Sequence, residues 1–150
     1  QVAQRAGVPL VIAGIVQDKG YFEEMVSPYI DGDQIRYIGP IGMPEKGELL
    51  GHARALLHMI NFDEPFGLSV VESMACGTPV IAIDRGSMPE LIRDGETGFL
   101  AASSENAVES MRRIDGIDRR KCRTWVEKHF TEAQMVEKYI QVYKMILEEE

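Results

Sequence analysis

The stretch from Gly67 to Ile83 reads GLSVVESMACGTPVIAI, and it decides the fold. Its apolar residues recur at helical spacing over Leu68–Cys76, and Gly77 is well suited to end that helix. Pro79 then introduces the β-branched run Val80–Ile83, which is apolar on both faces and therefore predicts a buried strand. A helix that leads directly into a buried strand is typical of a βαβ unit, in which helices cover parallel strands.

The same alternation of strands and helices continues on both sides of this stretch. The predicted strands are Pro9–Ala13, Gln34–Ile38, Ala55–Met59 and Val80–Ile83, and the predicted helices are Tyr21–Ile30, Glu45–Arg54, Leu68–Cys76, Pro89–Ile92, Glu105–Ile114, Arg119–Phe130 and Glu132–Leu147. A tight turn is expected at Asp94–Phe99, and Gly7 ends a further helix at the start of the chain. The pattern predicts an α/β fold, with a Rossmann-like parallel sheet, helices on both of its faces and a C-terminal helical tail.

Composition excludes several classes of protein. The 150 residues, of which 45% are hydrophobic, suffice for one domain covering 1–150. The formal net charge of −8 argues against a nucleic-acid surface, which needs clustered Lys and Arg. No apolar run approaches the roughly 20 residues that span a bilayer, and no signal peptide is recognisable, so we expect a soluble, cytoplasmic protein. Cys76 and Cys122 show no metal-ligand spacing, and we interpret both as ordinary thiols.

A ligand-binding end is predicted at the start of the helix Leu68–Cys76. Ligands of doubly wound sheets bind beyond the carboxyl ends of the strands, where loops turn into helix N-termini. The amides around Gly67 to Ser69 have no intrahelical partners and carry the positive end of the helix dipole, which suits a diphosphate. Glu64 and Glu72 flank this position, and a carboxylate can accept hydrogen bonds from the vicinal hydroxyls of a sugar or ribose.

Both carboxylates also have a purely structural interpretation. Ser69 and Glu72 have the S-x-x-E spacing of a capping box, in which each side chain binds a first-turn amide of the helix. Glu64 precedes Pro65, which keeps it extended, and it could serve only as an acidic residue of a surface loop. Spacing alone leaves these alternatives open.

The residues around the two carboxylates form a longer string. From Asp63 to Leu100 it reads DEPFGLSVVESMACGTPVIAIDRGSMPELIRDGETGFL. This string closely resembles the C-terminal domain of retaining GT-B glycosyltransferases, especially glycosyltransferase family 4. The likeness covers the E-x7-E pair Glu64 and Glu72, the segment MACGTPVIA, the glycine loop at Gly86, the acid Glu90 and the DGxTG turn. The segments LVIAG and IRYIG and the C-terminal helices fit more loosely, so that the resemblance spans nearly the whole chain.

The resemblance implies a role for each part of the site, with a nucleoside diphosphate sugar as donor and neither a metal ion nor another cofactor. As the catalytic residue, Glu64 would contact hydroxyls of the donor sugar in a positioning rather than a nucleophilic role. Glu72 would bind the ribose of the nucleotide. The segment expected to bind the donor sugar and diphosphate through its backbone comprises Phe66, Gly67, Leu68 and Ser69. The residues expected at the base are Pro40, Ile41, Gly42 and, more weakly, Lys46, which could instead be solvated.

The resemblance also implies a larger enzyme. Family members carry an Arg and a Lys, in a G-R-x-x-x-x-K-G-like stretch, that neutralise the donor diphosphate, and they carry an N-terminal acceptor domain. This sequence contains neither, so we expect a domain truncated at its N-terminus, without its first strand. The intact enzyme would transfer the sugar with retention, by front-face displacement in which the leaving diphosphate helps to deprotonate the acceptor. The chain alone would bind donor weakly and catalyse nothing.

Several questions stay open at this level. The sequence does not name the base, the sugar or the acceptor, and it leaves open a peripheral membrane association through the missing half. A nucleotide-sugar epimerase of GT-B fold is one alternative. A non-catalytic nucleotide-binding module is another, although it would have no use for Glu64.

Two further features have structural interpretations. His58 ends a predicted strand near the loop, where a lone His is more often a satisfied structural residue than a ligand. The last predicted helix carries an apolar stripe at helical spacing along one of its faces. This stripe is formed by Met135, Val136, Tyr139, Ile140, Tyr143 and Ile146. Taken alone, this stripe and Trp125 are most simply core. Because the last helix of family members crosses onto the N-terminal domain, the resemblance implies that part of the stripe is exposed.

Overall fold

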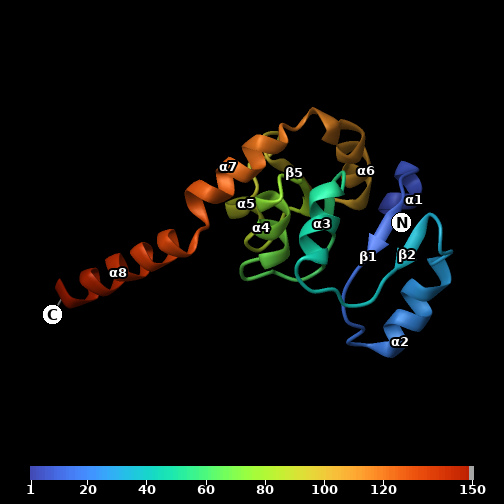
Figure 1. Cartoon of the computed structure of the whole chain (residues 1–150), viewed down its shortest axis with the longest axis horizontal. Coiled ribbons are helices and arrows are strands. Elements are labelled where there is room, and N and C mark those ends of the chain that lie inside the picture. Colours follow the sequence, from blue (N-terminus) through green and yellow to red (C-terminus); the bar gives the residue numbers. More distant parts are fainter. Residues whose placement is uncertain (149–150) are drawn as a thin grey trace.

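The computed structural model describes residues 1–148. In chain order its elements are α1 (Val2–Ala6), β1 (Leu10–Ile12), α2 (Lys19–Tyr21), a π-helical segment (Phe22–Val26), a 3₁₀ turn (Ser27–Tyr29), β2 (Ile35–Tyr37), α3 (Glu45–His52), β3 (Leu56–His58), α4 (Leu68–Ala75), β4 (Val80–Ile83), α5 (Met88–Leu91), β5 (Gly98–Ala101), α6 (Ser104–Arg113), a second 3₁₀ turn (Ile114–Gly116), α7 (Arg119–His129) and α8 (Glu132–Glu148). Figure 1 shows a compact body from which α8 projects. Within the described range, no helix is long and apolar enough to cross a membrane.

All strand pairs are parallel, which confirms the α/β, Rossmann-like prediction. Strand β1 pairs with β2, and β4 lies between β3 and β5. The single sheet expected from the sequence is, however, divided into these two sheets. Among residues 1–148, no strand bonds to the second edge of β1 or of β3. Helices pack on both sides of the strands, as predicted (Figure 1).

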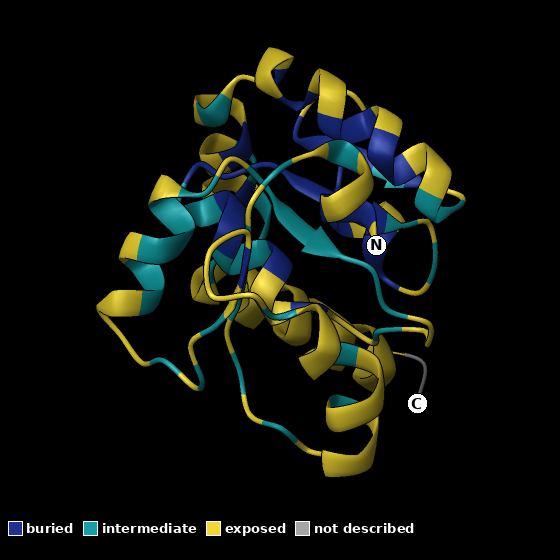
Figure 2. Cartoon of the chain, turned by 90° about the vertical axis from the view of Figure 1, so that its right-hand side faces the viewer, coloured by how far each residue is buried: buried dark blue, intermediate teal, exposed yellow. Residues whose placement is uncertain are grey.

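The core is concentrated around β4. Val80, Ile81 and Ala82 of this strand are 0% exposed, as are Val70 and Met74 of α4. Burying a Val, Ile or Met side chain fully contributes about 1.5–3 kcal/mol, so these residues make a large contribution to the hydrophobic stabilisation. Figure 2 shows the buried segments gathered in the body and the exposed helices outside them.

Two segments differ from their predictions. The helix expected at Tyr21–Ile30 begins earlier, at Lys19, because the Asp18 carboxylate caps it by accepting a hydrogen bond from the amide of Tyr21 at 2.9 Å. It then continues with π geometry over Phe22–Val26, where the amide of Ser27 donates to the carbonyl of Phe22. It ends in the 3₁₀ turn Ser27–Tyr29, in which Pro28 has no amide proton to continue an α-helix. The expected turn at Asp94–Phe99 ends sooner than predicted, because β5 already begins at Gly98.

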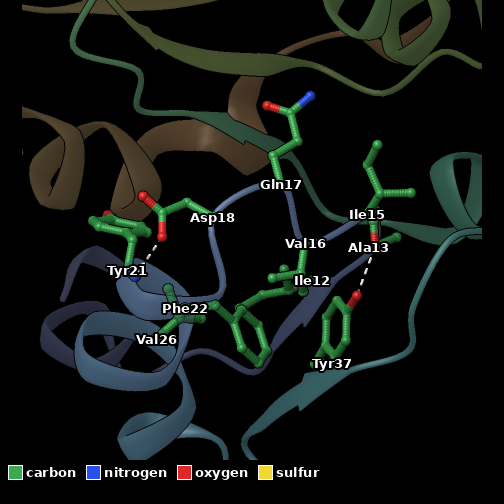
Figure 3. Close-up of a pocket in the computed structure, with 11 residues that line it drawn as sticks. Ile12, Ala13, Ile15, Val16, Gln17, Asp18, Tyr21, Phe22, Val26 and Tyr37 are labelled. Carbon is green, nitrogen blue, oxygen red and sulfur yellow. Dashed lines mark hydrogen bonds between the residues drawn. The ribbon is translucent and has the colours of Figure 1, made fainter.

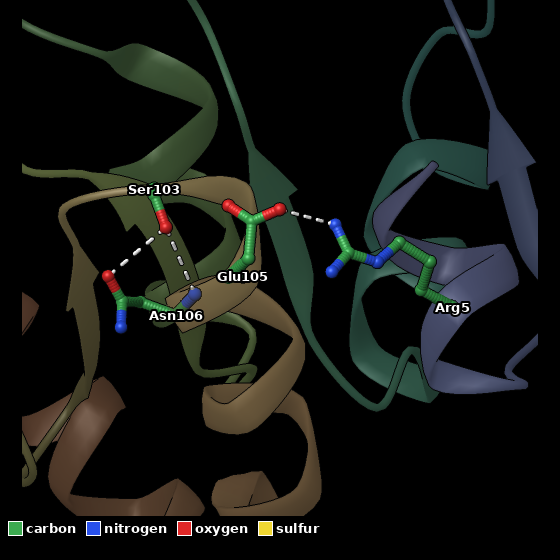
Figure 4. Close-up of polar contacts among 4 residues, drawn as sticks. All are labelled: Arg5, Ser103, Glu105 and Asn106. Atoms are coloured by element: carbon green, nitrogen blue, oxygen red, sulfur yellow. Dashed lines mark hydrogen bonds and ion pairs between the residues drawn. The ribbon is translucent and has the colours of Figure 1, made fainter.

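Helix α1 is attached to α6 by an exposed ion pair. Nη1 of Arg5 lies 2.6 Å from Oε1 of Glu105, in the first turn of α6 (Figure 4). That hydrogen bond, with help from the Glu105 amide and Ser103, lowers the pKa of Glu105 from 4.5 to about 2. Ser103 caps α6 by accepting a hydrogen bond from the amide of Asn106 at 3.3 Å.

The last two helices differ in burial. Trp125 of α7 is half-buried against the core and donates its Nε1 hydrogen to the carbonyl of Leu91 at 2.8 Å. By contrast, no residue of α8 is buried, and Tyr139 and Tyr143 are 57% and 59% exposed. The tail stripe is therefore exposed, as the resemblance implied, and its interpretation as core is wrong for this chain.

Candidate functional site

The N-terminus of α4 presents unpaired amides. Gly67 is the N-cap at φ 94°, and no side chain caps the helix. The first helical hydrogen bonds run from the amides of Val70 and Val71 to the carbonyl of Gly67. The amides of Leu68 and Ser69 therefore have no backbone acceptor in the part of the chain that the structure describes, and both residues are exposed. Such a helix end can bind an anion without a basic side chain.

Glu72 lies one turn further along α4 and points to a cation. Its Oε1 is 2.6 Å from Nζ of Lys46, on the first turn of α3. The two side chains keep 34% (Lys46) and 40% (Glu72) of their surface exposed. The capping-box alternative is wrong, because the N-cap is Gly67 rather than Ser69 and no side chain caps this helix.

The backbone around Glu64 is held by the loop that follows β4. The amide of Ser87 donates to the carbonyl of Glu64 at 3.0 Å, and Oγ of Ser87 donates to the carbonyl of Phe66 at 2.7 Å. Gly86 lies so close that a Cβ there would meet the nitrogen and oxygen of Glu64 at 2.6 and 2.8 Å. Gly86 and Ser87 thus fix the position of the Glu64 backbone.

Gly67 brings Glu64 next to the helix end. A Cβ on Gly67 would lie 2.8 Å from Cε of Met88 and 3.6 Å from Cγ of Glu64. A side chain at this position would therefore clash with α5, and glycine is also required by the positive φ. Phe66 remains 42% exposed while its ring makes an edge contact with Phe130, at a centroid distance of 6.4 Å. The side chain of Glu64 thus lies next to the residue at which α4 begins.

His58, at the end of β3, is not the satisfied structural residue that the sequence suggested. Its Nε2 is buried and has no hydrogen-bond partner among residues 1–148. Burial lowers the pKa of His58, and the negative charge of Glu64 opposes this shift. His58 therefore lies within electrostatic range of the site.

The segment expected at the nucleotide base follows β2. Pro40 and Gly42 are exposed and Ile41 is half-buried. The amide of Lys46 donates to the carbonyl of Gly42 at 2.8 Å, while its ammonium group contacts Glu72. The structure thereby places the base segment beside the carboxylate expected at the ribose.

A cavity of about 330 Å³ lies elsewhere, at the carboxyl ends of β1 and β2. Its lining includes Phe22 and Tyr37, and Oη of Tyr37 donates to the carbonyl of Gly14 at 2.8 Å (Figure 3). None of the predicted site residues lines this cavity. The candidate site is instead an open surface, on which Leu68 is 69% exposed.

Among the described residues, no group of three or more His, Cys, Asp or Glu side chains is arranged to hold a metal ion.

Comparison with known proteins identifies the family. The family described as "Glycosyl transferases group 1" matches residues 1–129 of this chain. The chain belongs to this family. Among curated relatives, a D-inositol 3-phosphate glycosyltransferase of Streptomyces scabiei is 37% identical over 75 residues, which are 50% of this chain and 17% of that protein. A protein of the same name from Mycobacterium marinum is 29% identical over 121 residues, or 77% of this chain and 26% of that protein.

Solved structures agree with this glycosyltransferase assignment. AviGT4, a glycosyltransferase involved in avilamycin A biosynthesis, superposes with a TM-score of 0.79 at 25% identity, over 97% of this chain and 46% of AviGT4. The Anabaena protein Alr3699/HepE in complex with UDP and glucose shares the fold, with a TM-score of 0.79 at 18% identity over 96% of this chain and 44% of that one. The chain thus spans less than half the length of each of these proteins.

Proposed function

We propose that this chain is the donor-binding domain of a retaining family 4 glycosyltransferase, which transfers a sugar from a nucleoside diphosphate sugar to an acceptor. The observation that carries the proposal is the start of α4, where the amides of Leu68 and Ser69 have no acceptor among residues 1–148, Cγ of Glu64 lies close to the N-cap Gly67, and Glu72 follows one turn along the helix. It combines carboxylates for hydroxyl groups with amide donors for a diphosphate.

The proposed roles follow the order of groups in the ligand. Glu64 binds hydroxyls of the donor sugar, and the backbone from Phe66 to Ser69 binds the sugar and the diphosphate. Glu72 accepts a hydrogen bond from the ribose, and the segment Pro40–Gly42 lies against the base. The solved complex of the Anabaena protein with UDP-glucose supports a nucleotide sugar as the ligand class and makes UDP the first nucleotide to test.

The proposed mechanism needs no protein nucleophile. The departing diphosphate takes the acceptor proton on the same face of the sugar, which retains the anomeric configuration. The contribution of this domain is electrostatic, because amides that already point at the diphosphate stabilise the charge that develops there without reorganising. Glu64 orients the sugar, and the fixed backbone around it lets this orientation persist through the reaction.

We also propose that the donor site is completed by other parts of the protein. The matched regions are only 17% and 26% of the two curated relatives, which supports a longer enzyme with an acceptor domain. In the related enzymes a basic Arg and Lys pair neutralises the diphosphate. The exposed stripe of α8 is the surface that we expect to contact the acceptor domain. By itself, the chain would bind donor weakly and transfer nothing.

The decisive experiment replaces Glu64 in the full-length protein. Glu64→Gln should lower kcat/KM for sugar transfer about 100-fold or more, because a misoriented donor sugar loses the advantage of positioning. The matched control is Glu109→Gln, which changes an exposed carboxylate of α6 that forms no ion pair within residues 1–148. Equal activities of the two variants would reject the role of Glu64.

Product analysis separates transfer from the alternative of epimerisation. With a radiolabelled nucleotide sugar, transfer moves the label to an acceptor with an unchanged anomeric configuration. Recovery of the label in an epimeric sugar without transfer would replace the glycosyltransferase proposal with a nucleotide-sugar epimerase.

A further inference from the structure

The ion pair between Lys46 and Glu72 connects two parts of the candidate site. Lys46 is on the first turn of α3, 26 residues before Glu72 on α4. Nζ and Oε1 are 2.6 Å apart, which is a charge-assisted hydrogen bond rather than a distant attraction. Since both side chains are more than one-third exposed, the pair contributes little to folding stability. We therefore expect the ion pair to act on ligand binding.

The contact with Lys46 uses only one of the two carboxylate oxygens of Glu72. A carboxylate accepts hydrogen bonds at both oxygens, and Lys46 binds only Oε1. Oε2 accepts no hydrogen bond from residues 1–148 and remains available to a hydroxyl group. An ammonium group on one oxygen restricts the rotation of the carboxylate and so fixes the direction in which the other oxygen points.

Lys46 is itself well anchored. Its amide donates to Gly42 at 2.8 Å, at the end of the base segment. The far end of α3 is held by Arg119, whose guanidinium donates to the carbonyls of Gly51 and Ala53 at 2.7 and 2.8 Å. The helix that carries Lys46 is thus fixed to the body of the protein at one end and to the base segment at the other.

We infer that Lys46 is a positioning residue, which aims the free oxygen of Glu72 at a ribose hydroxyl and couples ribose binding to the base segment. This inference rests on the proposed function, because it needs a nucleotide as ligand. It assigns Lys46 a contact with Glu72 in place of a direct contact with the base.

Ribose-dependent affinity distinguishes this role from the others. The full-length protein is titrated calorimetrically with the tightest-binding of UDP, GDP and ADP, and then with the 2′,3′-dideoxy analogue of that nucleotide. Lys46→Ala should weaken binding of the ribonucleotide roughly tenfold, the size of one lost hydrogen bond to a charged group, and leave the dideoxy nucleotide within about twofold. Lys46→Arg should restore most of the loss, and Lys121→Ala, on an exposed position of α7, should change neither affinity.

A double-mutant cycle tests the route through Glu72. In a Glu72→Gln background, Lys46→Ala should have no further effect on ribonucleotide binding, because the group that Lys46 positions is already lost. Additive losses would mean that Lys46 acts independently and would overturn the inference.

The remaining outcomes are separable. An equal loss for both nucleotides in Lys46→Ala would indicate a contact with the base or diphosphate, or a structural role, and would overturn the inference while leaving the proposed function intact. An unchanged ribonucleotide affinity in Lys46→Ala would also overturn the inference and leave the proposed function intact. A parent protein that binds none of the three nucleotides would refute the proposed function itself.

Discussion

The two sheets of the molecule differ in how firmly they are packed. In the sheet β3–β4–β5, strand β4 is almost wholly buried, and the loops around it hold Glu64 through Gly86 and Ser87. In the sheet β1–β2, all of β1 is only half-buried, and Ile35 is the one buried residue of β2. The sugar-binding carboxylate of our proposal thus lies on the well-packed region, and the base segment follows the loosely packed one. If the proposed roles hold, the sugar would be oriented by a residue held against the well-packed strand β4, and the base would lie against a segment that follows the less buried strands β1 and β2.

Core substitutions should give the largest difference between the two sheets. Ile81→Ala in β4 should lower the free energy of unfolding by about 4 kcal/mol, because it removes a fully buried side chain and leaves a cavity. Ile12→Ala in half-buried β1 should cost about 2 kcal/mol, since less apolar surface is lost and the site can relax. Urea denaturation of both variants measures these values. Equal losses in the free energy of unfolding would show that the two sheets are packed equally firmly.

A substitution at Gly86 should disturb only the region around β4 and Glu64. Gly86→Ala should destabilise the protein by about 2–3 kcal/mol, because φ is 55° and the new Cβ would clash with the backbone of Glu64. It should also weaken donor binding by displacing Glu64. The matched control is Gly95→Ala, where φ is 76° but no atom lies within 4 Å of the new Cβ.

The control isolates the effect of the clash. Gly95→Ala should cost only about 1 kcal/mol, the strain of a positive φ, and should leave donor affinity unchanged. Thermal unfolding and nucleotide titration of both variants give the two readouts. A donor affinity that survives Gly86→Ala would show that the loop does not position Glu64.

The ion pair between Arg5 and Glu105 should give the smallest effect, because both side chains are about half exposed or more. The folded-state pKa of Glu105 is about 2, below its ordinary 4.5, so the pair stabilises the fold above about pH 4.5 and loses this contribution as the pH falls towards 2. Glu105→Gln should therefore flatten the dependence of Tm on pH in that window. An unchanged slope would mean that this link from α1 to α6 is not formed in solution.

The regular elements could be predicted from the sequence because their signals are local. The apolar stripe of α4 and the glycine at its end placed that helix to within one residue, and the β-branched run placed β4. Strand β5 was missed because its four residues, Gly98–Ala101, follow a turn and carry no alternation that would distinguish them from a loop. The break between the two sheets was missed because no local pattern records which strands are neighbours.

The site was predictable in outline but not in its contacts. Glu64 and Glu72 could be selected from their spacing around a helix start, and the family string made that selection specific. The anchoring of Glu64 by Ser87 and the pairing of Glu72 with Lys46 join residues 23 and 26 positions apart, so only the folded chain reveals them. Nε2 of His58, which has no hydrogen-bond partner in the described range 1–148, is likewise a consequence of packing that no sequence motif predicts.

The projecting helix α8 also governs how the molecule tumbles. Its 17 residues make a rod of about 25 Å, at 1.5 Å per residue. A compact domain of this length has a radius of gyration of about 15 Å, and a rod held outside the body raises that value. Rotational diffusion of the free chain is therefore slower and more anisotropic than its mass implies. When another protein surface binds the stripe of α8, the helix becomes part of a larger and more compact particle. The anisotropy of rotational diffusion therefore reports whether α8 is bound.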